Sequence, residues 1–482
     1  MNYRIITRII GRILCVEAVF MIPALLISLF QGERAAALAL LVTIAASAVI
    51  GVLMALVKPT RSGFFAREGF VTVGLAWIVV SLFGALPFFI SREIPNFMDA
   101  LFETVSGFTT TGASILRDVE KMSDGLLYWR SFTHWLGGMG VLVFVLAIGP
   151  ITSGESGSTL YLLRAESPGP QVSKLVPRMR STAMILYAIY IVLTVLEAVL
   201  LLLGGMPIFD AVTTAFGTAG TGGFSIKATS LAGYSSYCQT VTAVFMVLFG
   251  VNFSIYYLIL IRQFKRILHN EELRVYLLII VAAVLIIALD IMHSYQSFAR
   301  ALHESFFQVA SIMTTTGFAT ADFNAWPELS RVILVLLMIV GACAGSTGGG
   351  IKVSRFLLLL KSGKRSLGQT LRPNSVKLIH MDGELVDDET VSGARSYLVI
   401  YCLIAMVSVL IVSLDNFSFD TSFSAVMACL NNIGPGLGAV GPTGNYADMS
   451  LLSKLILTFN MLLGRLELYP IIILFSPSAW KK

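Results

Sequence analysis

Four short stretches of this chain carry threonine or asparagine next to a glycine, so that backbone carbonyls and side-chain oxygens are concentrated where a cation can be bound. The clearest are "GFTTTGAS" at 107–114 and "MTTTGFAT" at 313–320, which nearly repeat one another. Two weaker copies are "TAGTGGFS" at 218–225 and "LNNIGPG" at 430–436. Extended backbone that aims its carbonyl oxygens at a common axis can replace the hydration shell of a cation. Because these oxygens are neutral and the stretches contain no carboxylates, the chemistry favours a monovalent cation over Ca²⁺ or Mg²⁺.

Each stretch follows an acidic residue at a nearly constant distance. The acid and the glycine are 13 residues apart for Asp99 and Gly112, Asp210 and Gly223, and Glu304 and Gly317, and 14 apart for Asp420 and Gly434. The roughly ten residues between them predict a short helix with the acid as its N-cap, near the positive helix end. Attraction of cations at an outer mouth is the alternative role for these acids.

The elements that position these stretches are membrane spans. The chain has 482 residues, 56% of them hydrophobic and 13% charged, with a mean hydropathy of +0.82, which indicates a polytopic membrane protein. About 20 apolar residues cross a bilayer as a helix. Ten runs meet this length, near 9–30, 35–57, 69–90, 126–149, 182–204, 237–261, 274–292, 330–360, 396–414 and 451–475.

The short helices and their loops lie between these spans, so the chain enters the membrane partway and returns. Lipid cannot satisfy irregular backbone, so the four loops must be buried together around one axis. The expected fold is all-α: two leading spans followed by four copies of helix, short helix, loop and helix. The expected divisions are 1–67 for the leading spans and 68–180, 181–272, 273–392 and 393–482 for the four copies.

Lysine and arginine are concentrated in alternate loops, which predicts that these loops and both termini are cytoplasmic. The residues concerned are Arg4, Arg8, Arg12, Lys58, Arg61, Arg67, Arg164, Lys174, Arg178, Arg180, Arg262, Lys265, Arg266, Arg274, the run 352–395, Lys481 and Lys482. A nucleic-acid surface explains this spread less well, and no nucleic-acid partner is expected. The five cysteines and five histidines show no spacing typical of a disulfide framework or a zinc site.

Two features near the inner ends of the stretches suggest a gate. "AGSTGGGIK" at 344–352 must break its span between Gly345 and Gly350, either as a flexible kink or as a mobile segment. It does not match the nucleotide-binding pattern GxxxxGK[ST]. Arg465 lies within the last span, where an ionisable side chain is costly. It forms either a structural contact, with Glu467 or a backbone carbonyl, or an electrostatic barrier in a cation pathway.

The four glycine stretches, "AGSTGGGIK", "NNIGPG" (431–436) and "GRLELYP" (464–470) together resemble the Trk/Ktr/HKT superfamily of potassium transporters over almost the whole chain. The two leading spans are most similar to its bacterial TrkH/TrkG branch. The resemblance implies four potassium-channel-like repeats around a central pore, a homodimer in the bacterial inner membrane, and a cytosolic nucleotide-binding regulatory ring of the TrkA type.

The resemblance also implies roles for individual residues. The K⁺ selectivity filter would comprise Thr110, Thr111, Gly112, Thr221, Gly222, Gly223, Thr315, Thr316, Gly317, Asn432, Ile433 and Gly434. The gate would comprise Gly345, Gly348, Gly349, Gly350, Lys352 and Arg465. A serine at the first filter position accompanies sodium transport in plant relatives, so Gly112 indicates potassium. The second and fourth copies depart from TTTG and leave K⁺/Na⁺ selectivity open.

The expected function is therefore potassium uptake driven by the membrane potential, with K⁺ as the transported ion and no organic cofactor. A K⁺ symporter coupled to H⁺ or Na⁺ is the alternative, with the intramembrane acid Glu197 as a relay. An enzyme is not expected, because no intramembrane nucleophile and base are recognisable.

Overall fold

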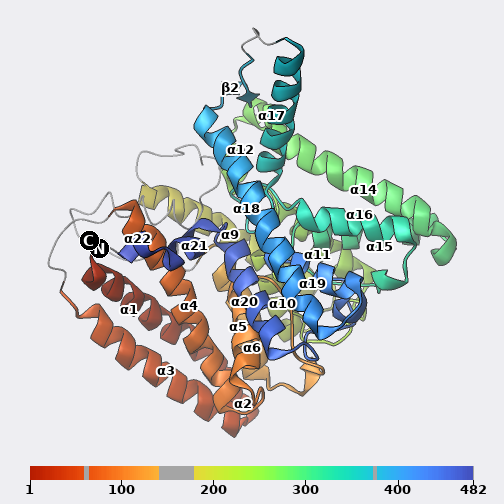
Figure 1. Cartoon of the computed structure of the whole chain (residues 1–482). Helices are drawn as coiled ribbons and strands as arrows, with labels where there is room; N and C mark the ends of the chain where they lie inside the picture. Colours follow the sequence, from red (N-terminus) through yellow and green to blue (C-terminus); the bar gives the residue numbers. More distant parts are fainter. Residues whose placement is uncertain (59–64, 141–178, 373–376, 481–482) are drawn as a thin grey trace.

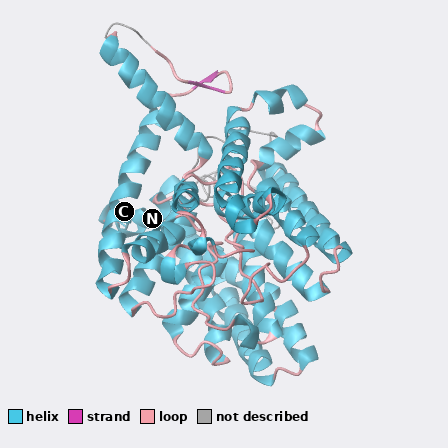
Figure 2. Ribbon diagram, turned by 90° about the vertical axis from the view of Figure 1, so that its right-hand side faces the viewer, coloured by secondary structure: helices cyan, strands magenta, loops and turns pink. Residues whose placement is uncertain are grey.

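The computed structural model describes residues 1–58, 65–140, 179–372 and 377–480. These residues are overwhelmingly helical, as Figure 2 shows. Within the described ranges, the strands are β1 (His380–Met381) and β2 (Glu384–Leu385), which form one antiparallel hairpin. The predicted all-α membrane fold with two leading spans and four repeats is confirmed, with this hairpin as an addition.

The two leading spans pack against each other at one side of the molecule (Figure 1). The first consists of α1 (Tyr3–Phe20) and α2 (Ile22–Gln31), and the second is α3 (Arg34–Ala55). A Cβ added to Gly11 would lie 2.6 Å from the carbonyl oxygen of Gly51. The absence of a side chain at Gly11 therefore lets α1 and α3 approach closely.

Each repeat begins with one long helix. These are α4 (Ala66–Ile90), α9 (Met179–Leu203), α14 (Glu271–Tyr295) and α18 (Asp388–Val412). With the two leading spans they give six helices in the described ranges that are long and apolar enough to cross a membrane, or seven if one bent pair is included. Large apolar side chains remain exposed on them, among them Val192, Leu278 and Leu410, as expected for surfaces that contact lipid.

A short helix follows in each repeat and ends at a glycine stretch. These helices are α5 (Phe97–Phe108), α10 (Ile208–Gly220), α15 (Phe298–Met313) and α19 (Phe419–Leu430). The longest has 16 residues, about 24 Å at 1.5 Å per residue, which is shorter than the hydrocarbon core of a bilayer. They are re-entrant helices, as predicted.

The second long helix of three repeats is broken into two pieces, and in the first repeat its described part stops early. The first repeat has α6 (Asp124–Gly138), and the others have α11 (Ser236–Phe249) with α12 (Phe253–Leu260), α16 (Glu328–Ile339) with α17 (Val353–Leu371), and α20 (Leu451–Arg465) with α21 (Tyr469–Phe475). The predicted break at Gly345 to Gly350 is confirmed. The rest of the predicted span 126–149, from residue 141, lies outside the described residues.

Two predicted continuous spans are wrong. In 237–261 the two pieces are bent by 91°, because the side chain of Asn252 accepts a hydrogen bond from Ser254 N and starts a new helix. In 451–475 the chain turns at Glu467 and Leu468, both with positive φ, before Pro470 in the first turn of α21.

Short elements complete the fold. They are the 3₁₀ turns η1 (Val119–Lys121), η2 (Phe323–Ala325), η3 (Ser413–Asp415) and η4 (Gly438–Val440), and the helices α13 (Phe264–His269) and α22 (Pro477–Trp480). The two ends of the described chain meet, with Tyr3 stacked on Trp480 at 6.4 Å. Of the basic residues used to predict orientation, Arg61, Arg164, Lys174, Arg178, Lys481 and Lys482 lie outside the described residues.

Candidate functional site

The four glycine stretches meet in a closed ring, and each glycine lies against a backbone carbonyl of the next repeat. A Cβ added to Gly112 would lie 2.0 Å from the oxygen of Gly222. The same distance is 2.0 Å from Gly223 to Thr316, 2.1 Å from Gly317 to Ile433, and 2.6 Å from Gly434 back to Thr111. The oxygen in each case belongs to the residue directly before the neighbour's glycine. The ring thus brings together all four predicted stretches with one repeated contact.

The backbone conformation also repeats around this glycine ring. The four glycines have φ values of 77°, 73°, 87° and 95°, in the left-handed region that a residue with a Cβ adopts at a cost. Two residues earlier, Thr110, Thr221, Thr315 and Asn432 have φ between 54° and 60°. Because this conformation is uncommon for residues other than glycine, its fourfold recurrence indicates that the packing of the ring imposes it.

Side chains next to the glycines tie the ring together instead of pointing freely at its axis. The hydroxyl groups of Thr109 and Thr111 lie 2.8 Å apart, and those of Thr314 and Thr316 lie 2.7 Å apart. The amide nitrogen of Asn432 donates to the Thr111 hydroxyl at 3.0 Å, joining the fourth repeat to the first. The Thr and Asn side chains beside the glycines are therefore engaged in hydrogen bonds within and between the stretches.

A buried ion pair behind the ring was not predicted. Arg130 Nε on α6 donates to Glu103 on α5 at 2.6 Å, with side chains 4% and 0% exposed. Glu103 also accepts from Ser114 Oγ and Ile115 N, just after the first stretch, both at 2.9 Å. Arg130 in turn donates to the carbonyl of Ser225, just after the second stretch, at 2.8 Å. One ion pair therefore braces two neighbouring stretches.

His134 and Tyr446 brace the ring at two further places, and neither was predicted. His134 Nε2 accepts from Phe224 N at 3.1 Å while its Nδ1 lies 2.8 Å from the carbonyl of Gly107. This pairing requires a neutral ring with the proton on Nδ1. The Tyr446 hydroxyl donates to the carbonyl of Gly434 at 2.7 Å. The only sequence signal for these residues is a polar side chain in an apolar setting.

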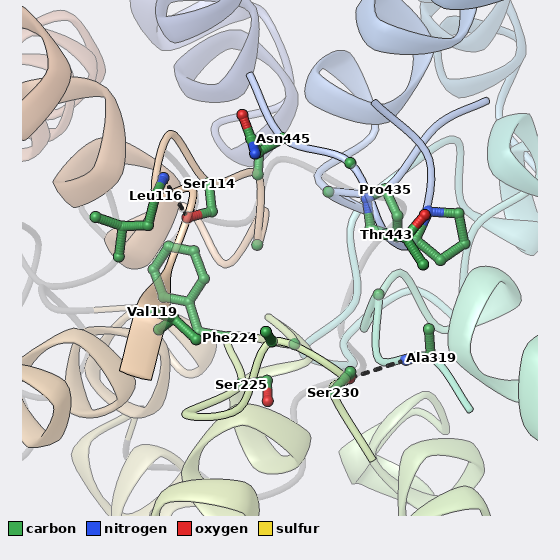
Figure 3. A pocket seen from close by; sticks show the side chains of 18 of the residues that line it. Ser114, Leu116, Val119, Phe224, Ser225, Ser230, Ala319, Pro435, Thr443 and Asn445 are labelled. Atoms are coloured by element: carbon green, nitrogen blue, oxygen red, sulfur yellow. Dashed lines mark hydrogen bonds between the residues drawn. The ribbon is translucent and has the colours of Figure 1, made fainter. Parts of the chain in front are cut away.

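One side of the ring opens into a cavity of about 150 Å³ that all four repeats line. Figure 3 shows Ser114 of the first repeat, Phe224 of the second, Ala319 of the third and Pro435 of the fourth around this opening. The four ring glycines are among its lining residues. A hydrated ion approaching from this side therefore meets the ring directly.

The acids that precede the short helices are not N-caps, so that prediction is wrong. Asn96 and Ser418 cap two of these helices with their side chains, and Glu304 lies inside α15. The acids bind other partners: Asp99 pairs with Lys454, Asp210 with Lys227 and Tyr234, Glu304 with Thr320, and Asp420 with Arg331. Three of them still lie in the first helical turn, where a negative charge is favourable.

On the side of the ring away from the cavity, the chain between α16 and α17 forms a buried loop, residues 340–352, which we call the inner loop. Its Gly349 N donates to the Thr315 hydroxyl at 2.6 Å. A Cβ at Gly349 would lie 2.4 Å from the carbonyl of Asn431. The predicted gate glycines Gly345, Gly348, Gly349 and Gly350 all belong to this loop, which therefore contacts the third and fourth stretches.

Arg465 joins the inner loop to the first repeat. It donates to the carbonyls of Thr347 at 2.7 Å and Gly138 at 2.6 Å, and also to that of Gly137. The backbone-carbonyl alternative for Arg465 is therefore confirmed. Glu467, the other suggested partner, pairs with Arg355.

Lys352 brings a second cation to this region. It is buried, and its ammonium group donates to the carbonyl oxygen of Gly348, inside the inner loop. Two basic side chains, Lys352 and Arg465, thus hold the loop through its own carbonyls, and both predicted gate cations lie at the loop.

Glu197 lies on α9, next to the start of the second stretch, and is fully buried. Its carboxylate faces the Thr218 hydroxyl of α10, but neither oxygen lies at hydrogen-bonding distance from a partner among the described residues.

Known proteins are similar to this chain over nearly its whole length. The model of the family TrkH, "Cation transport protein", matches residues 37–482. The Trk system potassium uptake protein TrkH of Salmonella typhimurium is 37% identical over the full length of both chains, and TrkG of Escherichia coli is 33% identical over all of this chain and 99% of its own. The crystal structure of the potassium transporter TrkH from Vibrio parahaemolyticus is 32% identical and superposes with a TM-score of 0.87 over all of both chains. This chain belongs to the TrkH family of cation transport proteins.

Proposed function

We propose that this protein takes up potassium ions across the bacterial inner membrane, through the ring formed by the four glycine stretches. The observation that carries the proposal is the closed ring of glycine-to-carbonyl contacts, in which an equivalent carbonyl of each repeat lies against the glycine of its neighbour. Carbonyls gathered in a ring can replace the hydration shell of a cation. The Trk relatives, described as potassium uptake proteins, support the choice of ion. The protein is then a transporter and not an enzyme.

The proposed filter is the set predicted from the sequence: Thr110, Thr111, Gly112, Thr221, Gly222, Gly223, Thr315, Thr316, Gly317, Asn432, Ile433 and Gly434. The membrane potential supplies the driving force, about 2.3 kcal/mol per charge per 100 mV. At 1.4 kcal/mol per tenfold, this supports roughly 40- to 50-fold accumulation per 100 mV.

The inner loop is the proposed gate. Its contacts with Thr315 and Asn431 support this role, because they place it across the inner side of the third and fourth stretches. Lys352 and Arg465 add positive charge there, and a cation crossing a low-dielectric region is repelled by such charges. Movement of the loop would remove the obstruction together with the charge of Lys352, and it would break the contact of Arg465 with Thr347.

The proposal extends to the assembly of the subunits and to their orientation in the membrane. We propose a homodimer with cytoplasmic termini, regulated by a cytosolic nucleotide-binding ring of the TrkA type. The name "Trk system" of the relatives supports a multi-subunit system. The proposed organisation has two leading spans at 1–67, followed by four repeats at 68–180, 181–272, 273–392 and 393–482.

A symporter coupled to H⁺ or Na⁺ is the second candidate, and Glu197 is the observation that favours it. A fully buried carboxyl group with no hydrogen-bond partner in the described part of the chain is costly when ionised, so its proton can respond to its surroundings. Reversal potentials measured in liposomes separate the two candidates. Values that follow only the K⁺ gradient exclude coupling, and values that shift with pH or Na⁺ establish it.

The proposal is tested by rescue of a K⁺-uptake-deficient bacterium at limiting K⁺, with the regulatory partner supplied. The wild-type chain should restore growth, and Gly112→Ser should not, because its side chain would meet the carbonyl of Gly222. Failure of the wild type to restore growth, when the protein is present in the membrane, contradicts the proposed function.

A further inference from the structure

Glu272, in the first turn of α14, joins the inner loop to the start of α17 through one oxygen. Its Oε1 accepts from Ala344 N at 2.7 Å and from Ser354 N at 3.0 Å. The side chain is almost fully buried, with 5% of the residue exposed. Hydrogen bonds to a buried carboxylate are stronger than those between neutral groups. A single side chain from outside the loop therefore joins a residue within the loop to the first turn of α17.

Backbone hydrogen bonds close the same neck but do not anchor it to α14. Gly341 N donates to Ile351 O at 2.9 Å, and Val353 N donates to Ala342 O at 3.2 Å. On its other side the loop is joined to the bend between α11 and α12, where Phe253 N donates to Gly345 O at 3.0 Å. Glu272 is thus the side-chain link between the loop and the first long helix of its own repeat.

The start of α14 is in turn fastened to the β1–β2 hairpin. Asp382, at the turn of the hairpin, accepts from Glu271 N at 2.6 Å and from the Asn270 side chain at 2.9 Å. Lys361 on α17 pairs with the Glu271 carboxylate and donates to His380 O at 2.7 Å. In Figure 1 the hairpin and α17 project together from one end of the molecule. The residue that the hairpin holds is therefore the direct neighbour of Glu272.

We propose that Glu272 is the latch of the inner loop, and that the β1–β2 hairpin keeps the latch in place by holding the start of α14. This inference deepens the proposed function, since it rests on the inner loop being the gate. A displacement of the hairpin would move Glu271 and shift Glu272 away from Ala344 and Ser354. The loop would then lose its anchor to α14 while the filter stretches stay in place. Glu272 acts as a positioning residue and touches no transported ion.

The alternative is that Glu272 only caps the first turn of α17 through Ser354 N. Capping requires only an acceptor near Ser354 N, so it does not depend on the hydrogen bond from Ala344 N. The two readings differ in what they predict for the loop itself. If Glu272 is a latch, a shorter side chain at this position exposes the loop. If it is only a cap, the loop stays closed and the protein becomes less stable.

Cys343 offers a native reporter inside the loop, because it is fully buried and precedes Ala344. In a background where Cys15, Cys238, Cys402 and Cys429 are replaced by alanine, its labelling rate with a small thiol reagent reports loop opening in the full-length protein. K⁺ flux from liposomes is measured on the same preparations. The labelling readout does not depend on transport, so failure of the latch and failure of the proposed function are distinguished.

Three substitutions of Glu272 distinguish the effect of side-chain length from the effect of charge. Glu272→Ala should raise Cys343 labelling at least about tenfold, the shift expected when a charge-assisted hydrogen bond is lost. Glu272→Asp keeps the charge but is one methylene shorter, so it should also raise labelling. Glu272→Gln keeps the reach and an acceptor oxygen, so it should remain near wild type. Asp388→Ala, which removes an exposed partner of Arg365 on α17, is the matched control.

The hairpin is tested by Asp382→Ala, which should raise Cys343 labelling, though less than Glu272→Ala does. Basal K⁺ flux should rise in the same order as labelling. Unchanged Cys343 labelling in both Glu272→Ala and Glu272→Asp overturns the latch. Labelling that rises in Glu272→Gln but not in Glu272→Asp also overturns it, because the charge of the side chain and not its length would then decide. Unchanged labelling in Asp382→Ala overturns the role of the hairpin. If Glu272→Ala is not recovered as folded protein, the Asp and Gln variants decide.

Discussion

Gly112→Ala should abolish most transport, and the structure gives the size of the effect. The added Cβ would lie 2.0 Å from the oxygen of Gly222, whereas Cβ contacts shorter than 3.0 Å essentially do not occur. The carbonyl of Gly222 must therefore move by about 1 Å, a displacement that can cost on the order of 100-fold where groups must be precisely placed. The φ of 77° adds about 1–2 kcal/mol of backbone strain for alanine.

The assay is K⁺ flux into liposomes containing purified protein, normalised to the amount incorporated. Gly205→Ala is the matched control, because Gly205 has a φ of 82° but no atom within 4 Å of an added Cβ. It carries the same type of backbone strain without the contact, and its flux should stay close to wild type. Flux in Gly112→Ala above half of the wild-type value would refute the reasoning. So would an equal loss in both variants, because strain alone would then account for the effect.

Three further predictions concern the rest of the site. Gly434→Ala should reduce flux less than alanine at the other three ring glycines, because its added Cβ lies 2.6 Å from the nearest carbonyl and theirs lie 2.0–2.1 Å away; equal losses in a four-variant flux series would contradict this ranking. Glu103→Ala should destabilise the protein by about 3–5 kcal/mol, because it leaves Arg130 buried without its partner. Thermal unfolding in detergent measures this, and Arg117→Ala, which breaks an exposed ion pair, should change little; a similar change in both would show that burial is not the cause. Arg465→Ala should raise basal K⁺ flux, because it removes a positive charge and releases the Thr347 carbonyl of the inner loop; unchanged flux in liposomes would exclude a barrier role.

The ring was predictable from the sequence because its requirement is local. Only glycine tolerates both the left-handed backbone and the close carbonyl at positions such as Gly112 and Gly317, so the residue type marks the place. The spacing from an acid then marks each copy. The order of contacts around the ring was not predictable, because it depends on how four copies pack in space.

The helix caps and the helix breaks could not be predicted from neighbouring residues alone. Asn96 and Ser418 are ordinary capping residues a few positions before the acids, but the acids are equally suitable by type. Only the positions of Lys454 and Arg331 decide between them, and these are distant in the chain. The bend at Asn252 was hidden because the surrounding run stays apolar, although an asparagine within such a run was the available signal.

The braces behind the ring could not be predicted from pattern. Glu103 and Arg130 lie 27 residues apart in different helices, and neither spacing nor composition pairs them. A charged residue inside an apolar run was the single signal, and it indicates a buried partner without naming it. The inner-loop anchor Glu272 is of the same kind, because a glutamate near the start of a helix is common.

The contact that closes the ring has a consequence for the biogenesis of the protein. Asn432 and Thr111 are 321 residues apart, and Lys454 and Asp99 are 355 apart. At about 5–20 residues per second, the first repeat waits roughly 18 to 71 s during synthesis before its last neighbour, Lys454, is made. Throughout that interval its threonine and glycine backbone has only part of its final shelter from lipid. The contacts that close the ring can therefore form only after the fourth repeat has been synthesised.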